Sequence, residues 1–326
     1  MEIRRYAFTA GTLLCLVTSA PIASAQVRLR AEAADTLPED VKLALRSATN
    51  VVSVFSISSN EHFAGKVLRA DEILFGENAQ LILDQVDADW VVIAAKKLKF
   101  QSPRKLSRIT FAAKQAPSGA TGNPGAHGAG GQAGAVGQPG SAGGTVQRPR
   151  LYLIVGEVVL QGNDSLQLEV HGIGVDGGSG GTGGRGGNGG RGNDGHNSRS
   201  NMLNCTRGAS NGDRGGAAGN GGPGGTGGTG GDGVSVMIVS KPAGLEVLGF
   251  TRVVNAGGRG GTGGAPGEPG IGGPGGAGGR GSLHCGGANA GPQGNAGARG
   301  APGVVGGDGA KGDYKLVEVA DLGTVL

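Results

Sequence analysis

The segment Gly177-Gly178-Ser179-Gly180-Gly181-Thr182-Gly183-Gly184 decides the fold of this 326-residue chain. Glycine recurs in it at every third position, and that period extends from Gly174 to Gly195 and again from Gly216 to Gly231. A flexible linker contains many glycines but needs no register. A polyproline-II-like helix has three residues per turn, and one side of each turn must be bare where another backbone approaches. The period therefore predicts ordered arms that pack side by side.

Three glycine-rich excursions of this kind interrupt the chain, at residues 115–149, 174–233 and 256–313. A polyproline-II-like helix has no internal hydrogen bonds, and ordering each residue costs about 1–2 kcal/mol. Pairing between arms can offset that cost, and three excursions that run out and back supply six arms for one bundle. Each excursion returns to a strand-like segment, namely Leu151 to Val155, Val234 to Val239 and Tyr314 to Val319. The excursions are thus insertions in one continuous fold, and disordered loops are the alternative.

The composition excludes a single conventional core, because 73 residues are glycine, 3% are aromatic and Trp90 is the only tryptophan. The formal net charge is +4. Arginines such as Arg185, Arg191 and Arg214 are spread among glycines with few aromatic neighbours. We therefore expect no nucleic-acid partner and no polybasic membrane patch.

The N-terminal residues predict export. Arg4-Arg5 precedes an apolar stretch from Ala7 to Ala20, and Ala23-Ser24-Ala25 provides a small-x-small cleavage site. Residues 1–25 are therefore predicted to be a signal peptide, and no transmembrane segment is expected. The expected location is extracellular or at the cell surface, with the periplasm as an alternative.

The remaining segments predict a small β scaffold. Residues 26–60 are expected to hold a helical cap and a first strand, with a helix from Leu37 to Arg46 that begins with a capping box at Thr36 and Glu39 and covers the open end of the sheet. The discontinuous scaffold comprises residues 61–114, 150–173, 234–255 and 314–326.

A weak repeat within this scaffold predicts stacked coils. Val67 to Phe75 aligns with Val92 to Phe100 at an offset of 25 residues, and Leu81 maps to Leu106 at that offset. Leu98, Phe100 and Leu106 align with Val158, Leu160 and Leu166 at an offset of 60, which absorbs the first excursion. The pattern predicts a mainly β, solenoid-like scaffold, with a β-sandwich as the alternative.

The glycine-rich runs resemble two known groups of proteins. Gly177 to Gly184 and Gly221 to Gly228 are similar to proteins with polyglycine-II bundles, such as springtail antifreeze proteins and glycine-rich phage tail-tip adhesins. Gly119 to Gly125 and Gly297 to Gly303 resemble bacterial collagen-like surface proteins. The resemblance implies polyglycine-II hairpins packed as a bundle. Short triplet runs, many Gly-Gly-X units and arms held between strands disfavour a collagen-like homotrimer.

The triplets stop between His196 and Asp213 and between Ser282 and Asn289, where the arms must turn. Cys205 and Cys285 lie in these turns, each 29 residues before the next strand-like segment, so the spacing predicts a disulfide between two turns at equal height. A Cys2His2 zinc site with His196 and His284 is the alternative. These turns form a candidate binding tip, which comprises His196, Asn197, Arg199, Asn201, Met202, Leu203, Asn204 and His284.

No catalytic site, metal site or cofactor is predicted. Asp84, Asp87 and Asp89 form the one acidic cluster of the scaffold, and their place between two predicted strands indicates a solvated turn. The sequence favours a structural or adhesive protein whose rigid bundle binds a surface glycan or another copy. Ice binding and a polysaccharide-active solenoid enzyme are the alternatives, although the arm threonines (Thr182, Thr226, Thr229 and Thr262) are few for an ice-binding face.

Overall fold

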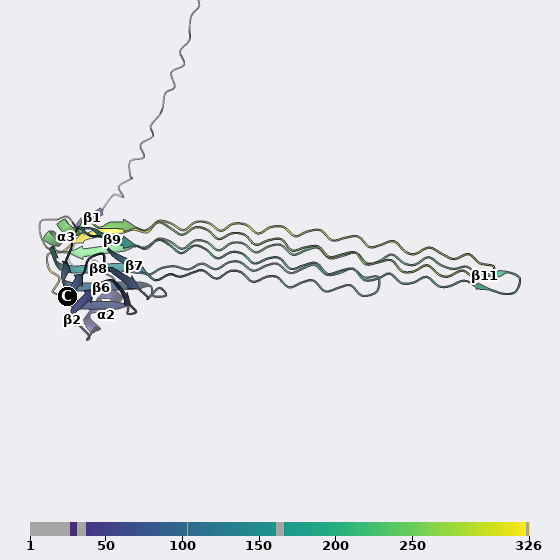
Figure 1. Cartoon of the computed structure of the whole chain (residues 1–326), viewed down its shortest axis with the longest axis horizontal. Helices are drawn as coiled ribbons and strands as arrows, with labels where there is room; N and C mark the ends of the chain where they lie inside the picture. Colours follow the sequence, from purple (N-terminus) through teal and green to yellow (C-terminus); the bar gives the residue numbers. More distant parts are fainter. Residues whose placement is uncertain (1–26, 31–36, 103, 161–165, 324–325) are drawn as a thin grey trace, which may run out of the picture.

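The computed structural model describes residues 27–30, 37–102, 104–160, 166–323 and 326. The predicted signal peptide lies outside the described residues, as does Thr36. Figure 1 shows two sheets at one end of the molecule, from which the glycine-rich segments extend together as long, nearly straight chains. The expectation of a mainly β protein is confirmed. In the described residues no helix has the length and apolar character that crossing a bilayer requires.

Two sheets make up the scaffold, and every strand pair in them is parallel. The seven-stranded sheet has the order β1-β14-β12-β8-β6-β4-β2. Its strands are β1 (Val27–Arg30), β2 (Val52–Ile57), β4 (Val67–Phe75), β6 (Trp90–Phe100), β8 (Arg150–Leu160), β12 (Val236–Ser240) and β14 (Tyr314–Glu318). The five-stranded sheet has the order β13-β9-β7-β5-β3. Its strands are β3 (Asn60–Phe63), β5 (Gln80–Leu83), β7 (Ser107–Phe111), β9 (Leu168–His171) and β13 (Arg252–Val254). Parallel pairing throughout argues against the sandwich alternative, since sandwiches are antiparallel.

The chain alternates between the two sheets, and apolar side chains from both sheets form the main core. Ile73, Leu98 and Ile109 are almost fully buried in it, and the rings of Phe75 and Phe100 stack with centroids 5.2 Å apart. The stacking follows from the register, because Phe75 lies beside Phe100 in the β4–β6 pair. The repeat read from the sequence is thus a row of like residues on adjacent strands.

The predicted offsets hold for strands of the seven-stranded sheet and fail for strands of the five-stranded sheet. Val67 pairs with Val92 and Phe100 with Leu160, so the offsets of 25 and 60 are confirmed there. The predicted match of Leu81 to Leu106 is wrong, because Leu81 pairs with Ile109. The match of Leu106 to Leu166 is also wrong, since Ser107 is the first β7 residue to pair with β9. The reason is a longer turn after Phe100 than after Phe75, which leaves Leu106 40% exposed ahead of β7.

Helix α2 (Glu39–Ser47) differs from its prediction in start and position. The helix begins at Glu39 with Pro38 as its N-cap residue, whereas a start at Leu37 was predicted. The apolar side chains of α2 join Trp90 and Ile154 in a second core on the seven-stranded sheet. The helix therefore covers a face of that sheet and does not cover its open end.

A second helix, α3 (Pro242–Leu248), was not predicted from the sequence. It connects β12 to β13, and Leu245 and Leu248 are buried in the main core. Seven residues are too few for a clear helical period, although Pro242 in the first turn is a typical start signal.

The excursions all leave the scaffold at equivalent places. Each starts after a strand of the five-stranded sheet (β7, β9 or β13) and ends at a strand of the seven-stranded sheet (β8, β12 or β14). These strands are neighbours within their sheets, in the orders β13-β9-β7 and β14-β12-β8. Adjacent strands lie about 4.8 Å apart, so the outgoing chains begin side by side, as do the returning chains.

Candidate binding tip of the glycine-rich arms

The three excursions form six extended arms, numbered here in chain order. Arms 1, 3 and 5 (residues 119–130, 174–197 and 256–280) run outward, and arms 2, 4 and 6 (residues 134–144, 210–233 and 288–313) return. Each layer is joined by backbone hydrogen bonds. Arm 3 pairs with arm 1 at Gly119 N to Ser179 O, 2.7 Å, and with arm 5 at Gly177 N to Arg259 O, 2.8 Å. Arm 4 likewise pairs with arms 2 and 6, so the outgoing arms form one layer and the returning arms another.

Further backbone hydrogen bonds join the two layers. Gly222 N donates to Gly184 O of arm 3 at 2.8 Å, and Gly264 N donates to Gly225 O of arm 4 at 2.8 Å. Arms 3 and 4 therefore lie in the interior and arms 1 and 6 at opposite edges. The layers continue the two sheets of the scaffold, because the outgoing arms emerge from one sheet and the returning arms enter the other.

The number of glycines in each triplet follows this arrangement. Interior arms 3 and 4 carry two glycines in most triplets, whereas edge arms 1 and 6 carry one in most. In arm 3, a Cβ added to Gly183 would lie 2.0 Å from Gly222 O of arm 4, and one added to Gly184 would lie 2.0 Å from Asn123 O of arm 1. Each glycine thus marks a side on which another backbone lies.

Triplets of the interior arms lose their second glycine beyond the point where a neighbouring arm ends. The first excursion is shorter than the others (Figure 1). Its far end lies beside Gly190 and Gly216, where an added Cβ would be 1.8 Å from a carbonyl oxygen of that excursion. One triplet farther out these positions are Asn193 and Asp213, whose side chains are hydrogen bonded at 3.1 Å. Polar side chains therefore replace glycine beyond the end of the first excursion.

Side chains keep the arms in register along their whole length. Asp176, Asn188, Asp194 and Asn197 on arm 3 each accept a hydrogen bond from the backbone N–H located 83 residues later on arm 5. Asn211, Asn220 and Asp232 on arm 4 accept in the same way from arm 6, always with a separation of 78 residues. A constant separation from the scaffold to the far end means that no slip occurs between these arms.

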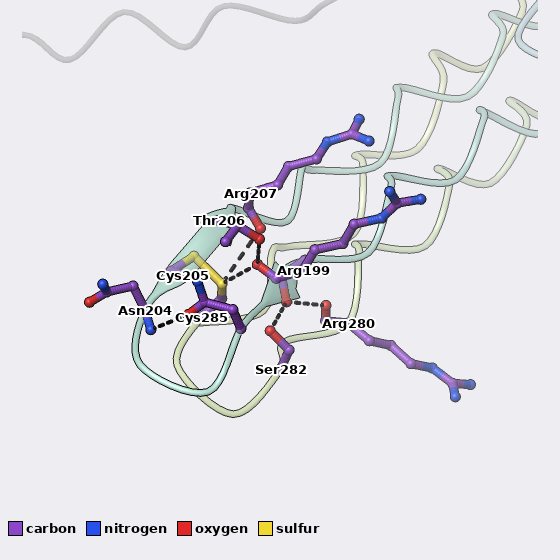
Figure 2. The surroundings of a disulfide bond; sticks show 10 residues. Arg199, Asn204, Cys205, Thr206, Arg207, Arg280, Ser282 and Cys285 are labelled. Atoms are coloured by element: carbon purple, nitrogen blue, oxygen red, sulfur yellow. Dashed lines mark hydrogen bonds between the residues drawn. A yellow bond between two sulfur atoms is a disulfide. The ribbon is translucent and has the colours of Figure 1, made fainter.

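The far end of the bundle, here called the tip, comprises residues 198–208 and 281–287 together with Arg280, the last residue of arm 5. Cys205 and Cys285 form a disulfide across it, with an S–S distance of 2.04 Å. The first loop contains the short antiparallel pair β10 (Arg199–Ser200) and β11 (Cys205–Arg207). Figure 2 shows the disulfide joining the two loops, with Ser282 beneath it. The Oγ atom of the buried Ser198 lies 3.0 Å from Ser282 Oγ, which connects the loops a second time.

The predicted tip residues divide into structural and exposed groups. Asn197 accepts the Arg280 N–H, and Asn201 Oδ1 accepts the N–H groups of Leu203 and Asn204 at 3.0 and 2.7 Å, so both asparagines shape the turn. His284 Nε2 lies 3.3 Å from Met202 O and links the loops. The side chains of Met202 and Leu203 remain 91% and 81% exposed.

Three tip residues were not identified from the sequence, namely Arg207, Arg280 and Leu283. Leu283 is 83% exposed, and the arginine side chains point away from the disulfide, as does that of Arg199 (Figure 2). The arginines noted from the sequence, such as Arg185 and Arg214, lie on the arms, whereas these three come together at the turns from separate positions in the chain. Their nearness to Cys205 and Cys285 in the sequence was the available signal.

The tip cysteines and the acidic cluster of the scaffold were the candidates for a metal site and a catalytic site. Over the described ranges, no group of three or more His, Cys, Asp or Glu side chains could hold a metal ion. Both tip cysteines are in the disulfide. In the scaffold cluster, Asp84 Oδ1 lies 2.9 Å from His62 Nδ1 and Asp87 pairs with Lys114.

Comparisons with known proteins identify no family. No family model matches this chain, and no curated protein matches it. A solved structure with weak similarity is the nine polyproline type II helical bundle springtail antifreeze protein from Granisotoma rainieri. The identity is 22%, and the match covers 58% of this chain and 97% of that chain with a TM-score of 0.08. A score this low supports no conclusion about fold or function.

Proposed function

We propose that this protein is a secreted or cell-surface structural protein that uses a stiff glycine-rich bundle to present an adhesive tip. In this proposal the scaffold is a β-solenoid whose coils each contribute one strand to each sheet. Its last coils extend into six polyglycine-II arms. The tip at the end of the arms contacts a surface or a second copy of the protein.

The constant register between arms is the observation that supports this proposal most. Side-chain acceptors hold arms 3 and 5 at a separation of 83 residues from Asp176 to Asn197, and the disulfide fixes the far end. A flexible display loop would not need matched acceptors along its length. Stiffness is useful when a binding surface must stand away from the body that carries it.

The side chains available for recognition also favour the tip. The interior arms expose one side chain per triplet, and several of these, such as Asn188 and Asp194, are occupied by hydrogen bonds to the next arm. The tip instead exposes Met202, Leu203 and Leu283 nearly completely. The arms thus supply reach and the tip supplies contact chemistry.

The arrangement of the arms is less suited to the alternatives. Thr182 and Thr262 lie on arms of the outgoing layer, whereas Thr226 and Thr229 lie on an arm of the returning layer. The threonines are therefore divided between the layers and make no single ice-binding row. Homotrimerisation is disfavoured because the glycines of the interior arms already face backbones of the same chain.

The proposal can be tested with two matched variants of the mature protein. Met202→Ser/Leu203→Ser changes the tip, and Arg185→Gln/Thr182→Ser changes exposed positions of arm 3. Self-association is measured by sedimentation velocity, and adhesion by retention on a glycan array and on phospholipid vesicles. The proposal predicts that the tip variant loses interactions that the arm variant keeps. Loss in the arm variant alone, or no interaction of the unaltered protein in any assay, would contradict it.

A further inference from the structure

The tip combines exposed apolar side chains from two separate loops. Met202 and Leu203 belong to the first loop and Leu283 to the second, with exposed fractions of 91%, 81% and 83%. The Cys205–Cys285 disulfide and the contact between His284 and Met202 O hold the loops against each other. The apolar side chains are therefore presented together by a cross-linked turn, which loses little conformational entropy on binding.

The same loops carry a concentrated positive charge. The guanidinium groups of Arg199, Arg207 and Arg280 have no ion-pair or hydrogen-bond partner within the described part of the chain, and Figure 2 shows all three extending away from the disulfide, on the side from which the arms reach the tip. Residues 195–212 and 279–290 contain no Asp or Glu. The nearest carboxylates on arms 3 and 4 are Asp194 and Asp213. Asp194 also accepts from Arg191, at 2.7 Å. The net positive charge of the tip is therefore not neutralised locally.

We propose that the tip docks on a phospholipid bilayer that contains anionic headgroups. This inference rests on the proposed function of the arms as a stiff support. Arginine forms paired hydrogen bonds with phosphate oxygens, and exposed Leu and Met side chains bury apolar surface at the boundary between headgroups and acyl chains. Neither signal alone gives stable attachment, but a cationic group combined with inserted apolar side chains does.

Other partners fit only part of this surface. An acidic protein would satisfy the three arginines but gives no specific reason for three nearly fully exposed apolar side chains. A neutral glycan would leave the charge unused, and the described tip residues include no Phe, Tyr or Trp side chain to stack on a sugar. An anionic bilayer accounts for both features together.

Vesicle co-sedimentation of the mature, disulfide-bonded protein tests the inference. The protein should bind vesicles of phosphatidylglycerol mixed with phosphatidylcholine and should bind pure phosphatidylcholine much more weakly. Binding should weaken as salt increases, since the headgroup attraction is screened. The variant Arg199→Gln/Arg207→Gln/Arg280→Gln should bind anionic vesicles about 100-fold more weakly, from the usual contribution of each basic residue near an anionic surface.

A second variant tests the apolar part, and a third is the matched control. Met202→Ser/Leu203→Ser/Leu283→Ser should also reduce binding, by about tenfold or more. Arg185→Gln/Arg259→Gln/Lys311→Gln removes the same charge from the arms and should bind as the unaltered protein does. Circular dichroism melts show whether each variant keeps its fold.

Three outcomes would overturn the inference. They are absence of binding to anionic vesicles, equal loss in the arm control, and binding to polyglutamate without binding to vesicles, which would identify an acidic polypeptide as the partner. A distance measurement between the base of the arms and the tip separates this inference from the function on which it rests. If the base-to-tip distance is long but the protein does not bind vesicles, only the lipid partner is refuted. If the distance is short, the proposed function is refuted.

Discussion

The substitution Gly225→Ala tests whether the glycine period is a packing register. Gly225 lies on arm 4, and a Cβ built there would be 1.9 Å from Ser141 O of arm 2. An ordinary carbon–oxygen contact is about 3.4 Å, so the two arms would have to separate by about 1.5 Å. That separation breaks the hydrogen bonds from Gly140 N to Pro223 O, 3.0 Å, and from Gly143 N to Thr226 O, 2.9 Å.

The expected cost follows from these contacts. Two hydrogen bonds contribute about 0.5–1.5 kcal/mol each, and overpacking a close contact costs about 1–3 kcal/mol. Reduced freedom of the unfolded chain offsets about 0.4–1 kcal/mol of this. We therefore expect Gly225→Ala to lower the free energy of unfolding by about 2–5 kcal/mol.

Urea unfolding followed by far-ultraviolet circular dichroism, with the disulfide intact, measures this change. The matched control is Thr226→Ala, which alters the next residue of the same arm, where the side chain is exposed. It should change the free energy of unfolding by less than about 0.5 kcal/mol. If the two variants unfold at the same urea concentration, glycine is not required at position 225 for packing and the reasoning fails.

The remaining predictions concern three other features. Gly190→Ala should lower the melting temperature of the bundle, whereas Asn193→Ala, one triplet beyond the end of the first excursion, should change it by only a few degrees. Differential scanning calorimetry measures both melting temperatures. A larger loss for Asn193→Ala than for Gly190→Ala would contradict the match between glycines and neighbouring arms. Replacing Cys205 and Cys285 by Ser opens a loop with a sequence separation of 80 and should cost about 4–5 kcal/mol on the chain-entropy model, measured by urea unfolding; an unchanged midpoint would show that the disulfide does not constrain the unfolded chain. Burial raises the pKa of Tyr314 to about 12, so the folded state resists ionisation and loses stability as the pH rises from about 10 toward 12. Tyr314→Phe should remove this loss and leave stability at pH 7 equal or higher, because the buried hydroxyl has no hydrogen-bond partner among the described residues; parallel alkaline decline in both proteins would refute the assignment.

Periodicity predicted the parts of the scaffold that depend on repeated burial. Val67 to Phe75 and Val92 to Phe100 pair at the predicted offset because like residues on adjacent parallel strands face the same core. The offset failed at Leu106 because the length of a surface turn is not fixed by burial on either side of it. Helix α3 was missed for a related reason, since its seven residues take their helical form from contacts with the core.

The tip was predicted from breaks in the glycine period. The sequence did not show which of its side chains are exposed and which shape the turn. Asn201 and Met202 were grouped as one binding surface, yet one shapes the turn and the other is exposed. Arg207 and Arg280 are far apart in the sequence, and their nearness depends on how the third excursion aligns with the second. That alignment depends on the total length of both excursions and cannot be read from either turn alone.

The distance between the base of the arms and the tip tests the central claim most directly. Spectroscopic labels on unnatural amino acids at Arg259 and Leu283, both exposed, report this distance by pulsed dipolar spectroscopy. At about 3.1 Å per residue, an extended arm predicts a narrow distribution centred at roughly 60–75 Å. A flexible glycine-rich chain of the same length would give a broad distribution centred at about 27 Å, and that result would contradict the account.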